Sequence, residues 1–439
     1  MIAALDRWFH LDARGTTTAR ECLAGLTSFM AAAYLIVVIP GLLSSGGMDR
    51  AAATTATIAM LTLGSLAMGL YTNLPFIVGP GLGGSAILGV TLAQVEHVPW
   101  QAGLGIAMLS GILFLALTLT GARGLVMRLV PVQIKLGLGA SLGLYIALLG
   151  CRDAGMVALN AKSNAFALGN FAASGPIAAL VGLAVAVALQ ARRIPGAVLA
   201  GIVAAALVGI PLGLTKLGGA PVDLPHGLGP IALRADLPAA IALASLPYLF
   251  AFFAGEFFST LGTTLAVGAK AGLTDSHGDL PGIERPFLVD SIAATLGPLI
   301  GVPAGTALVE SAAGVEAGGR TGLTAVAAAI LFLLTLLLTP LAMAIPKQAT
   351  APALILIGIA MLGTIRNAAG ERTEDLLPAM VMLLVTLIAN SFGTGIAAGI
   401  FVHVLVQILA GRWRELPIGL VILAIPLGYY FVTAATGHH

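Results

Sequence analysis

Charged residues are scarce in this sequence: Asp, Glu, Lys and Arg make up 9% of its 439 residues, against 58% hydrophobic residues. A chain with so little charge and a mean hydropathy of +1.02 is not a soluble domain. Its apolar runs of about 17 to 25 residues are each long enough to cross a bilayer core about 30 Å thick. The pattern predicts an all-α polytopic membrane protein, because a β-barrel would show short alternating segments instead.

Cysteine is nearly absent as well. Cys22 and Cys151 belong to no motif, so the sequence predicts neither a disulfide nor a metal site. It also lacks a P-loop, HExxH and CxxC, and we therefore expect no enzymatic activity, no cofactor, no nucleic-acid partner and no ATP-driven step. The N-terminus has no apolar core followed by a small-residue cleavage site, so we expect no signal peptide. Its amphipathic pattern fits either a helix on the membrane surface or a disordered tail.

The apolar segments form two series, separated by a polar, Pro/Gly-rich stretch at 215–237. We place them at 22–45, 52–71, 78–95, 102–121, 135–151, 173–191 and 195–214, and then at 239–268, 286–302, 304–317, 321–345, 352–365, 376–391, 393–411 and 416–435. There are thus seven segments before this stretch and seven or eight after it. Two similar halves suggest an internal repeat, and seven segments per half, an odd number, make the halves inverted. The segment 416–435 is an extra crossing, an interfacial helix, or the result of dividing one long helix at "NSFGTG".

The distribution of basic residues predicts the orientation. Those expected on the cytoplasmic side are Arg7, Arg14, Arg20, Arg123, Arg128, Lys135, Arg192, Arg193, Lys270, Arg285, Arg366 and Arg372. Fewer are expected outside, namely Arg152, Lys162, Lys216, Arg234 and Lys347. Because Lys and Arg are enriched in cytoplasmic loops, this bias predicts a cytoplasmic N-terminus in a cell inner (plasma) membrane protein.

Two segments are interrupted by Pro and several Gly: "NLPFIVGPGLGGSAILGVTLA" (73–93) and "PLIGVPAGTALVESAAGVEAGG" (298–319). They are the third of the first half and the third of the second. Such a pair in matching positions is the best sequence indicator of a transporter binding site. In each, we expect an extended piece that leads to a half-helix near mid-membrane, whose N-terminus presents free N–H groups to a ligand.

Glu310 lies at or near the start of the second half-helix, beside Thr306 and Val309. A carboxylate at mid-membrane costs about 3 kcal/mol on insertion scales, so it is by default a candidate functional residue. The alternative is that Glu310 caps the half-helix. Its own position in the interrupted segment favours substrate binding, with backbone N–H groups near Ser85, Val309 and Glu310 as further donors.

Glu256 is the single charge between Ala239 and Gly268. Three- and four-residue spacing places it on one helix face with Phe252, Ser259, Thr260 and Thr263. An aromatic ring, a carboxylate and hydroxyls on one face suit a flat polar heterocycle. The alternative is that the hydroxyls bond to backbone carbonyls and that Phe252 faces lipid or core.

Three other charged residues have mainly structural interpretations. Asp290 lies near the cytoplasmic start of its segment, where it caps the helix or pairs with Arg285 or Lys270. Glu316 and Arg320 close the second half-helix, where an ion pair or a gating contact is expected.

Five stretches together resemble the azaguanine-like (hypoxanthine/guanine/adenine) branch of the nucleobase–cation symporter-2 permeases. They are "ECLAGLTSFMAAAYLIVVIPGLLSSGGMD", "NLPFIVGPGLGGSA", "IKLGLGASLGLYIALLGCRDAGMV", "FFSTLGTTLAVG" and "LVESAAGVEAGGRTGLTA". The resemblance implies a uracil-permease-like fold with about 14 transmembrane helices in two inverted repeats of seven. It implies a core domain from residues 1–122 and 238–350, and a gate domain from 123–237 and 351–439. It also implies proton-coupled uptake of a nucleobase, an elevator-like movement of the core, and a homodimer.

The resemblance also assigns roles to residues. Glu310 matches the tenth-helix glutamate that contacts the base, and Glu256 falls at the substrate-binding acidic position of the eighth helix. Glu256 and Glu310 are then the candidates for proton coupling. The sequence departs from the branch at Ser259, Ser85 and Ile39, where an acidic residue and two asparagines are usual. A site with altered hydrogen-bonding partners selects differently, so a related planar N-heterocycle is as compatible as a standard purine.

A second hypothesis is an anion carrier or channel of the same broad fold. Such a site would combine half-helix dipoles with a basic residue. Glu256 and Glu310 argue against it, because two carboxylates repel an anion. A membrane-embedded enzyme or sensor has no supporting motif.

Overall fold

The computed structural model describes residues 2–121, 130–159, 166–216, 222–275, 280–363, 365 and 373–436. Five basic residues used to predict orientation lie outside this part of the chain, as does the predicted domain boundary at 122/123; the residues are Arg123, Arg128, Lys162, Arg366 and Arg372. In the described part, eight helices are long and apolar enough to cross a membrane, and five shorter apolar helices accompany them. The predicted all-α membrane architecture is therefore confirmed.

The first half of the chain folds mostly into helices. They are α1 (Ile2–Phe9), α2 (Thr18–Ala32), α3 (Leu35–Ser45), α4 (Arg50–Ala67), α5 (Leu82–Ala86), the π-helix η3 (Ile87–Val95), α6 (Trp100–Leu119), α8 (Val132–Asp153), α9 (Ser174–Ala191) and α10 (Ala197–Gly209). Strand β1 (Val78–Pro80) precedes α5, and the short pair β2 (Val157–Leu159) and β3 (Phe166–Leu168) follows α8. The N-terminal segment forms helix α1, so the alternative of a disordered tail is wrong for residues 2–9.

The second half likewise has helices before a short strand, a short helix directly after it, and further helices to its end. Its helices are α11 (Leu237–Ala240), α12 (Leu246–Lys270), α13 (Glu284–Ile300), α14 (Ser311–Glu316), α15 (Gly322–Leu334), α16 (Thr339–Ala344), α17 (Lys347–Leu362), α18 (Thr373–Ala389), α19 (Phe392–Leu409) and α20 (Ile418–Thr436). Strand β4 (Gly305–Ala307) lies between α13 and α14, in the position that β1 has in the first half.

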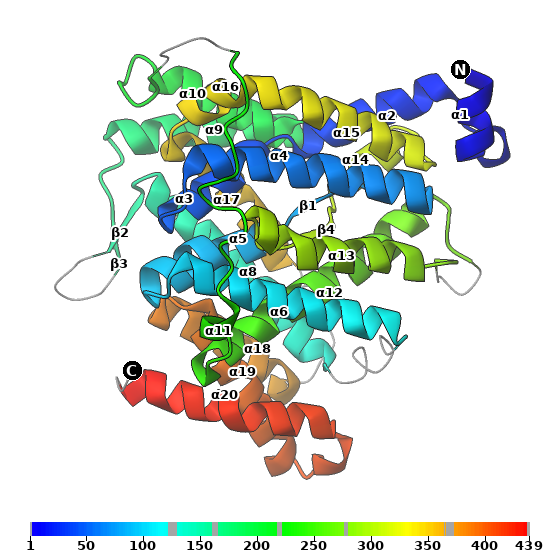
Figure 1. Ribbon diagram of the computed structural model, residues 1–439. Coiled ribbons are helices and arrows are strands. Elements are labelled where there is room, and N and C mark those ends of the chain that lie inside the picture. The colour runs from blue at the N-terminus through cyan, green and yellow to red at the C-terminus, as the bar shows by residue number, and fades with distance from the viewer. Residues whose placement is uncertain are drawn as a thin grey trace.

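The two interrupted segments meet at the centre of the molecule. Strands β1 and β4 pair antiparallel, with Gly79 opposite Thr306, and all six of their residues are buried. Each strand leads into a short helix, α5 or α14 (Figure 1). Backbone N–H and C=O groups at membrane depth must find hydrogen-bond partners within the protein. The strand pairing provides these partners for the two extended pieces, and the N-terminal ends of α5 and α14 face other elements. The predicted extended pieces and half-helices are thus present.

The helices pack in two groups. The strand-bearing group consists of α2 to α6 and α12 to α16, which pack among themselves and around β1 and β4. In the flanking group, α8 packs along α17, α9 and α10 pack on α17, and α18 and α19 pack on α8. Contacts between the groups run mainly through α3, α5 and α12 on one side and α8, α17 and α19 on the other. The site described below lies at this seam.

Residues 222–240 connect the two halves along one face of the bundle (Figure 1). Three backbone hydrogen bonds hold this connection: Asp223 N–H to Leu337 O, Leu233 N–H to Leu299 O, and Asp236 N–H to Gln101 O. The segment crosses the helices as an extended strap, as its Pro/Gly-rich composition indicates.

The C-terminal segments are three separate helices. Asn390 adopts a positive φ of 50°, and the hydroxyl of Ser391 accepts a hydrogen bond from the Thr394 N–H at the start of α19. The stretch "NSFGTG" therefore contains a break at Asn390 and Ser391, and its last four residues begin α19, which packs against α18. The alternative of one long helix divided at this point is wrong, and α20 is a helix of its own along the edge of the bundle (Figure 1).

Basic residues mark the two ends of the bundle. One end, which we term the Lys270 end, carries Arg14, Lys270 and Arg320, with Arg14 donating to the Arg320 carbonyl at 3.0 Å. The other, the Lys347 end, carries Arg152 and Lys347, which line one cavity. Helices α8 and α17 thus run antiparallel between the two ends.

Candidate functional site

A cavity of about 230 Å³ lies at the seam, beside the starts of both half-helices. Its walls come from α3, α5, α12, β4 and the residues between β4 and α14 in the strand-bearing group, and from α8 and α17 in the flanking group. Six residues predicted from the sequence line it: Phe252, Glu256, Ser259, Thr306, Val309 and Glu310. No basic residue is among the described residues that line it. We call it the central cavity.

Glu310 stands at the N-cap position of α14, which confirms its predicted location. Its side chain makes no capping hydrogen bond, so the alternative role as a helix cap is wrong. Instead, Oε1 accepts a hydrogen bond of 2.5 Å from the hydroxyl of Tyr34, at the break between α2 and α3. Tyr34 also lines the cavity, and the sequence reasoning missed it. Its signal was a lone phenol in the apolar run "AAAYLIVV".

Glu256 lies against the start of the first half-helix. A Cβ on Gly81 would be 3.2 Å from Glu256 Oε1, and a Cβ on Gly84 would be 3.4 Å from Phe252 Cε1. Glycine at these positions lets the carboxylate and the ring approach the backbone closely. Glu256 is buried, and its Oε2 has no hydrogen-bond partner. A buried polar oxygen without a partner indicates that something else completes the site.

Asp290 lies in the interior of α13 and is fully buried. Its Oδ2 accepts hydrogen bonds of 2.7 Å from the Thr260 hydroxyl and from the Ala307 N–H, while Oδ1 has no partner. The expectation that Asp290 caps its helix or pairs with Arg285 or Lys270 is therefore wrong. The carboxylate instead ties α12 and α13 to β4. Thr260 points toward Asp290 and does not line the central cavity.

Replacing Asp290 should destabilise the protein in a way that depends on the new side chain. Asp290→Ala leaves the Thr260 hydroxyl and the Ala307 N–H without an acceptor, at about 1–3 kcal/mol for each buried group. We expect a markedly lower apparent melting temperature for Asp290→Ala, while Asp290→Asn retains most of the stability because its amide oxygen still accepts. Thr264→Val is the control, since the buried Thr264 hydroxyl has no partner. Equal melting temperatures for Asp290→Ala and the parent would contradict this role.

Ser85 is buried but is not among the residues that line the central cavity. Its hydroxyl and its N–H both donate to the Gly81 carbonyl, at 2.9 Å and 3.1 Å. The N–H of Ser85 itself is therefore occupied, so a free N–H near Ser85 has to come from the residues before it. In the first half-helix, the N–H groups without intrahelical partners are the earlier ones, at residues 82–84.

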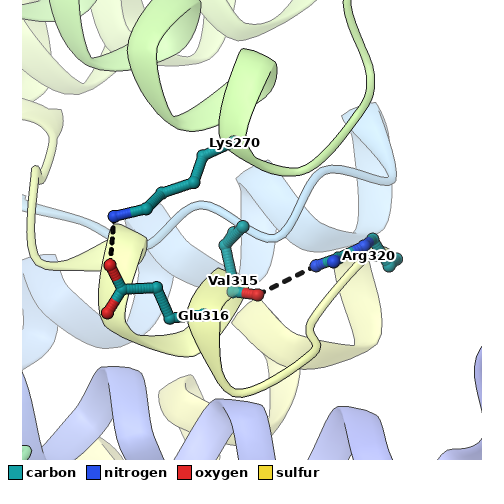
Figure 2. A network of polar contacts seen from close by, with 4 residues as sticks. All are labelled: Lys270, Val315, Glu316 and Arg320. Carbon is teal, nitrogen blue, oxygen red and sulfur yellow. Dashed lines mark hydrogen bonds and ion pairs between the residues drawn. The ribbon is translucent and has the colours of Figure 1, made fainter.

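Glu316 and Arg320 lie at the other end of α14 (Figure 2). Glu316 forms an ion pair with Lys270 at the end of α12. The guanidinium of Arg320 donates to the carbonyls of Val315 and Gly319, and so caps the C-terminal end of α14. Neither residue lines the central cavity. The buried carboxylate of Glu21, which sequence reasoning missed, accepts from the N–H groups of Arg320 and Thr321 and holds the start of α15.

The central cavity opens toward the Lys270 end. Gly255 and Ser259 on α12 are exposed, and no atom lies within 4 Å of a Cβ placed on Gly255 or on Gly262, farther along the same helix. Val309, at the lip of the cavity, is 62% exposed. A polar molecule of modest size can therefore reach both glutamates from this end.

Comparison with known sequences places this chain among membrane permeases. Residues 19–400 match the profile of the permease family. The guanine/hypoxanthine permease PbuO of Bacillus subtilis is 34% identical over 427 residues, covering 95% of this chain and 98% of the relative. The adenine permease AdeP of Escherichia coli is 33% identical over 421 residues, covering 96% of this chain and 94% of the relative.

Solved structures share the arrangement of helices. The transmembrane domain of the bicarbonate transporter BicA of a cyanobacterium superimposes with a TM-score of 0.64, at 15% sequence identity. The superposition covers 87% of this chain and 97% of that domain. At this level of identity, the likeness concerns the fold alone.

Proposed function

Because this chain belongs to the permease family, we propose that it is a secondary transporter that carries a purine nucleobase or a related planar N-heterocycle together with protons. The observation that carries this proposal is the pair of glutamates facing one cavity that has no basic residue in its described lining. Relatives named as guanine/hypoxanthine and adenine permeases, similar over nearly the whole chain, support the same class of substrate.

The geometry suits a flat ligand with N–H donors. Phe252 offers a ring face, and the cavity of about 230 Å³ has room for one small heterocycle. Glu310, whose Oε1 is occupied by Tyr34, has Oε2 to accept from a ring N–H. Glu256 Oε2 lacks a partner and can donate to a ring acceptor when the carboxyl is protonated. One ionised and one protonated carboxyl together recognise both edges of such a base.

This division of roles also supplies proton coupling. An ionised carboxylate without a cation or donor is costly in a low-dielectric site. A proton on Glu256 removes that cost when the base binds, and the proton leaves with the base on the other side. Glu256 and Glu310 are thus the proposed coupling residues, with Glu256 as the proton carrier.

We further infer that transport occurs by an elevator-type movement. Both half-helices belong to the strand-bearing group, which then acts as the mobile core, while the flanking group acts as the gate. The positive-inside distribution assigns the Lys270 end to the cytoplasm of an inner (plasma) membrane, so the present cavity is inward-open. A homodimer held by the gate groups would provide a fixed frame for this movement.

The movement can be followed by cysteine labelling. In a chain with Cys22→Ser and Cys151→Ser, we expect the water accessibility of Val309→Cys, at the lip of the cavity, to change on addition of hypoxanthine and a proton gradient. Ser174→Cys, at the start of α9 in the flanking group, is the matched position that should change little. Equal changes at both positions would favour a rocking motion of two halves over an elevator.

The alternative of an anion carrier has the fold similarity to BicA in its favour. The lining of the central cavity argues against it, since two carboxylates without a basic residue repel an anion. The chain's similarity to nucleobase permeases at 33–34% identity also favours the base.

Uptake into proteoliposomes tests the proposal. We expect labelled hypoxanthine, guanine or adenine to accumulate when the interior is more alkaline, and bicarbonate and sulfate not to accumulate. A thermal-shift screen over purines, pyrimidines and their degradation products should identify the preferred base, given the departures at Ser85, Ser259 and Ile39. Uptake of bicarbonate or sulfate without any response to bases would overturn the proposal in favour of the anion carrier.

A further inference from the structure

A second cavity, of about 240 Å³, lies along the same seam toward the Lys347 end. It is lined by residues of α3 and η3 on the strand-bearing side and of α8 and α17 on the flanking side. Its polar groups are Ser45, Gln94, Arg152, Asp153, Lys347 and Thr350. We call it the outer cavity.

The two cavities are aligned along shared helices. The lining moves from Leu35 to Val38 on α3, which is three residues, and from Leu142 to Leu149 on α8, which is seven residues. At 1.5 Å per residue, the nearest lining residues of the two cavities are about 5 Å apart along α3 and about 10 Å apart along α8. Ile146, in the intervening turn of α8, is fully buried. The outer cavity thus adjoins the central cavity on the side of the Lys347 end.

The two compartments have opposite electrostatic character. The central cavity presents two glutamates, whereas the outer cavity presents two cations and one carboxylate, an excess of one positive charge. Asp153 is within electrostatic range of both Lys347 and Arg152, so it offsets part of their charge. Arg152 also reaches the Asn390 amide oxygen at 3.4 Å, which leaves most of its donors for other partners.

From this arrangement we propose that the outer cavity is a recruitment site for bases that carry exocyclic carbonyl oxygens, or for their monoanions. This inference rests on the proposed function and adds a second site to it. The planar donor fork of Arg152 suits a carbonyl or enolate oxygen on a ring, and Lys347 adds a mobile charge at the rim. An amino-substituted base such as adenine presents a donor in place of the carbonyl, so it offers the two cations only its ring nitrogens and gains less from them.

The test compares hypoxanthine, which has a carbonyl, with adenine, which has an amino group. The variant Arg152→Gln/Lys347→Gln should raise the KM for hypoxanthine uptake by about three- to tenfold at low salt, and that for adenine by less than about twofold. Asp153→Asn should have the opposite effect and lower the KM for hypoxanthine. Both effects should shrink as ionic strength rises.

Control experiments separate an effect on recruitment from effects on general surface charge, on binding in the central cavity and on folding. Lys216→Gln/Arg234→Gln removes two exposed cations that are predicted on the same side but do not line the cavity, and should leave both KM values unchanged. The equilibrium affinity of the purified chain for hypoxanthine, which the central glutamates dominate, should change less than about twofold in the outer-cavity variants. Lys347→Gln alone keeps the test valid if loss of Arg152 impairs folding, because Lys347 is exposed.

The outcomes are distinct. An unchanged KM in both charge variants would overturn the recruitment site, as would equal increases for hypoxanthine and adenine. A loss of equilibrium affinity equal to the rise in KM would also overturn it, by assigning the effect to the central cavity. If the parent chain neither binds nor transports a base, the proposed function itself fails, and this result does not depend on any outer-cavity variant.

Discussion

Glu310→Gln should weaken base binding by about tenfold to hundredfold while leaving the fold intact. The Glu310 carboxylate is held on one oxygen by the Tyr34 hydroxyl at 2.5 Å, and we propose that the other oxygen accepts a ring N–H. The glutamine side chain keeps the shape of the carboxylate, but its NH2 group replaces one of the two acceptor oxygens. This donor then faces either the Tyr34 hydroxyl or the ring N–H of the base, which are donors themselves. Loss of a hydrogen bond to a charged group and the resulting unmatched donor cost about 1.5–3 kcal/mol. Binding of hypoxanthine to the purified chain measures the effect.

Glu316→Gln is the matched control for this experiment. Glu316 is six residues farther along the same half-helix, and its side chain is 60% exposed and paired with Lys270 away from the cavity. We expect it to bind bases like the parent. Tyr34→Phe should give an intermediate loss, because the carboxylate remains but is no longer held in one orientation. A Glu310→Gln protein with parental affinity would show that this glutamate does not contact the ligand.

Glu256→Gln should separate transport from the proton gradient. If Glu256 takes up a proton when the base binds, the parent's apparent affinity is highest at low pH and falls as pH rises and the proton is lost. The glutamine permanently resembles the protonated group, so binding should become nearly independent of pH. Exchange of labelled for unlabelled base should persist, whereas accumulation driven by an inward proton gradient should be lost. Proteoliposomes with and without a pH gradient report both quantities.

The same control, Glu316→Gln, should retain gradient-driven accumulation. Glu256→Asp is a useful companion, because it keeps a titratable group but withdraws it from Gly81. We expect this variant to retain coupling with reduced affinity. Full gradient-driven uptake by Glu256→Gln would remove Glu256 from the proton role and leave Glu310 as the remaining candidate.

Several features of this protein were determined by the sequence alone. The cost of a charge in an apolar environment made Glu256 and Glu310 candidates, and both line the central cavity. Pro and Gly within 73–93 and 298–319 predicted interrupted crossings, because both residues are unfavourable in helix interiors, and the structure has a strand and a short helix in each. These properties follow from the residue types and from the membrane environment. They can therefore be predicted without knowing which elements pack against each segment.

Only the tertiary structure decided which groups meet. Helical periodicity placed Thr260 on the face of Glu256, but a helix in a bundle has neighbours on several sides, and Thr260 turns to Asp290. Ser85 fell in the right segment, yet its hydroxyl bonds back to Gly81. Tyr34 and Glu310 are 276 residues apart, and only the packing of α2 against α14 brings the hydroxyl to the carboxylate. Such contacts depend on how neighbouring helices are rotated and shifted along their axes relative to one another. The pattern of residues within one segment does not contain this information, because it defines a face of the helix without defining the element that covers this face.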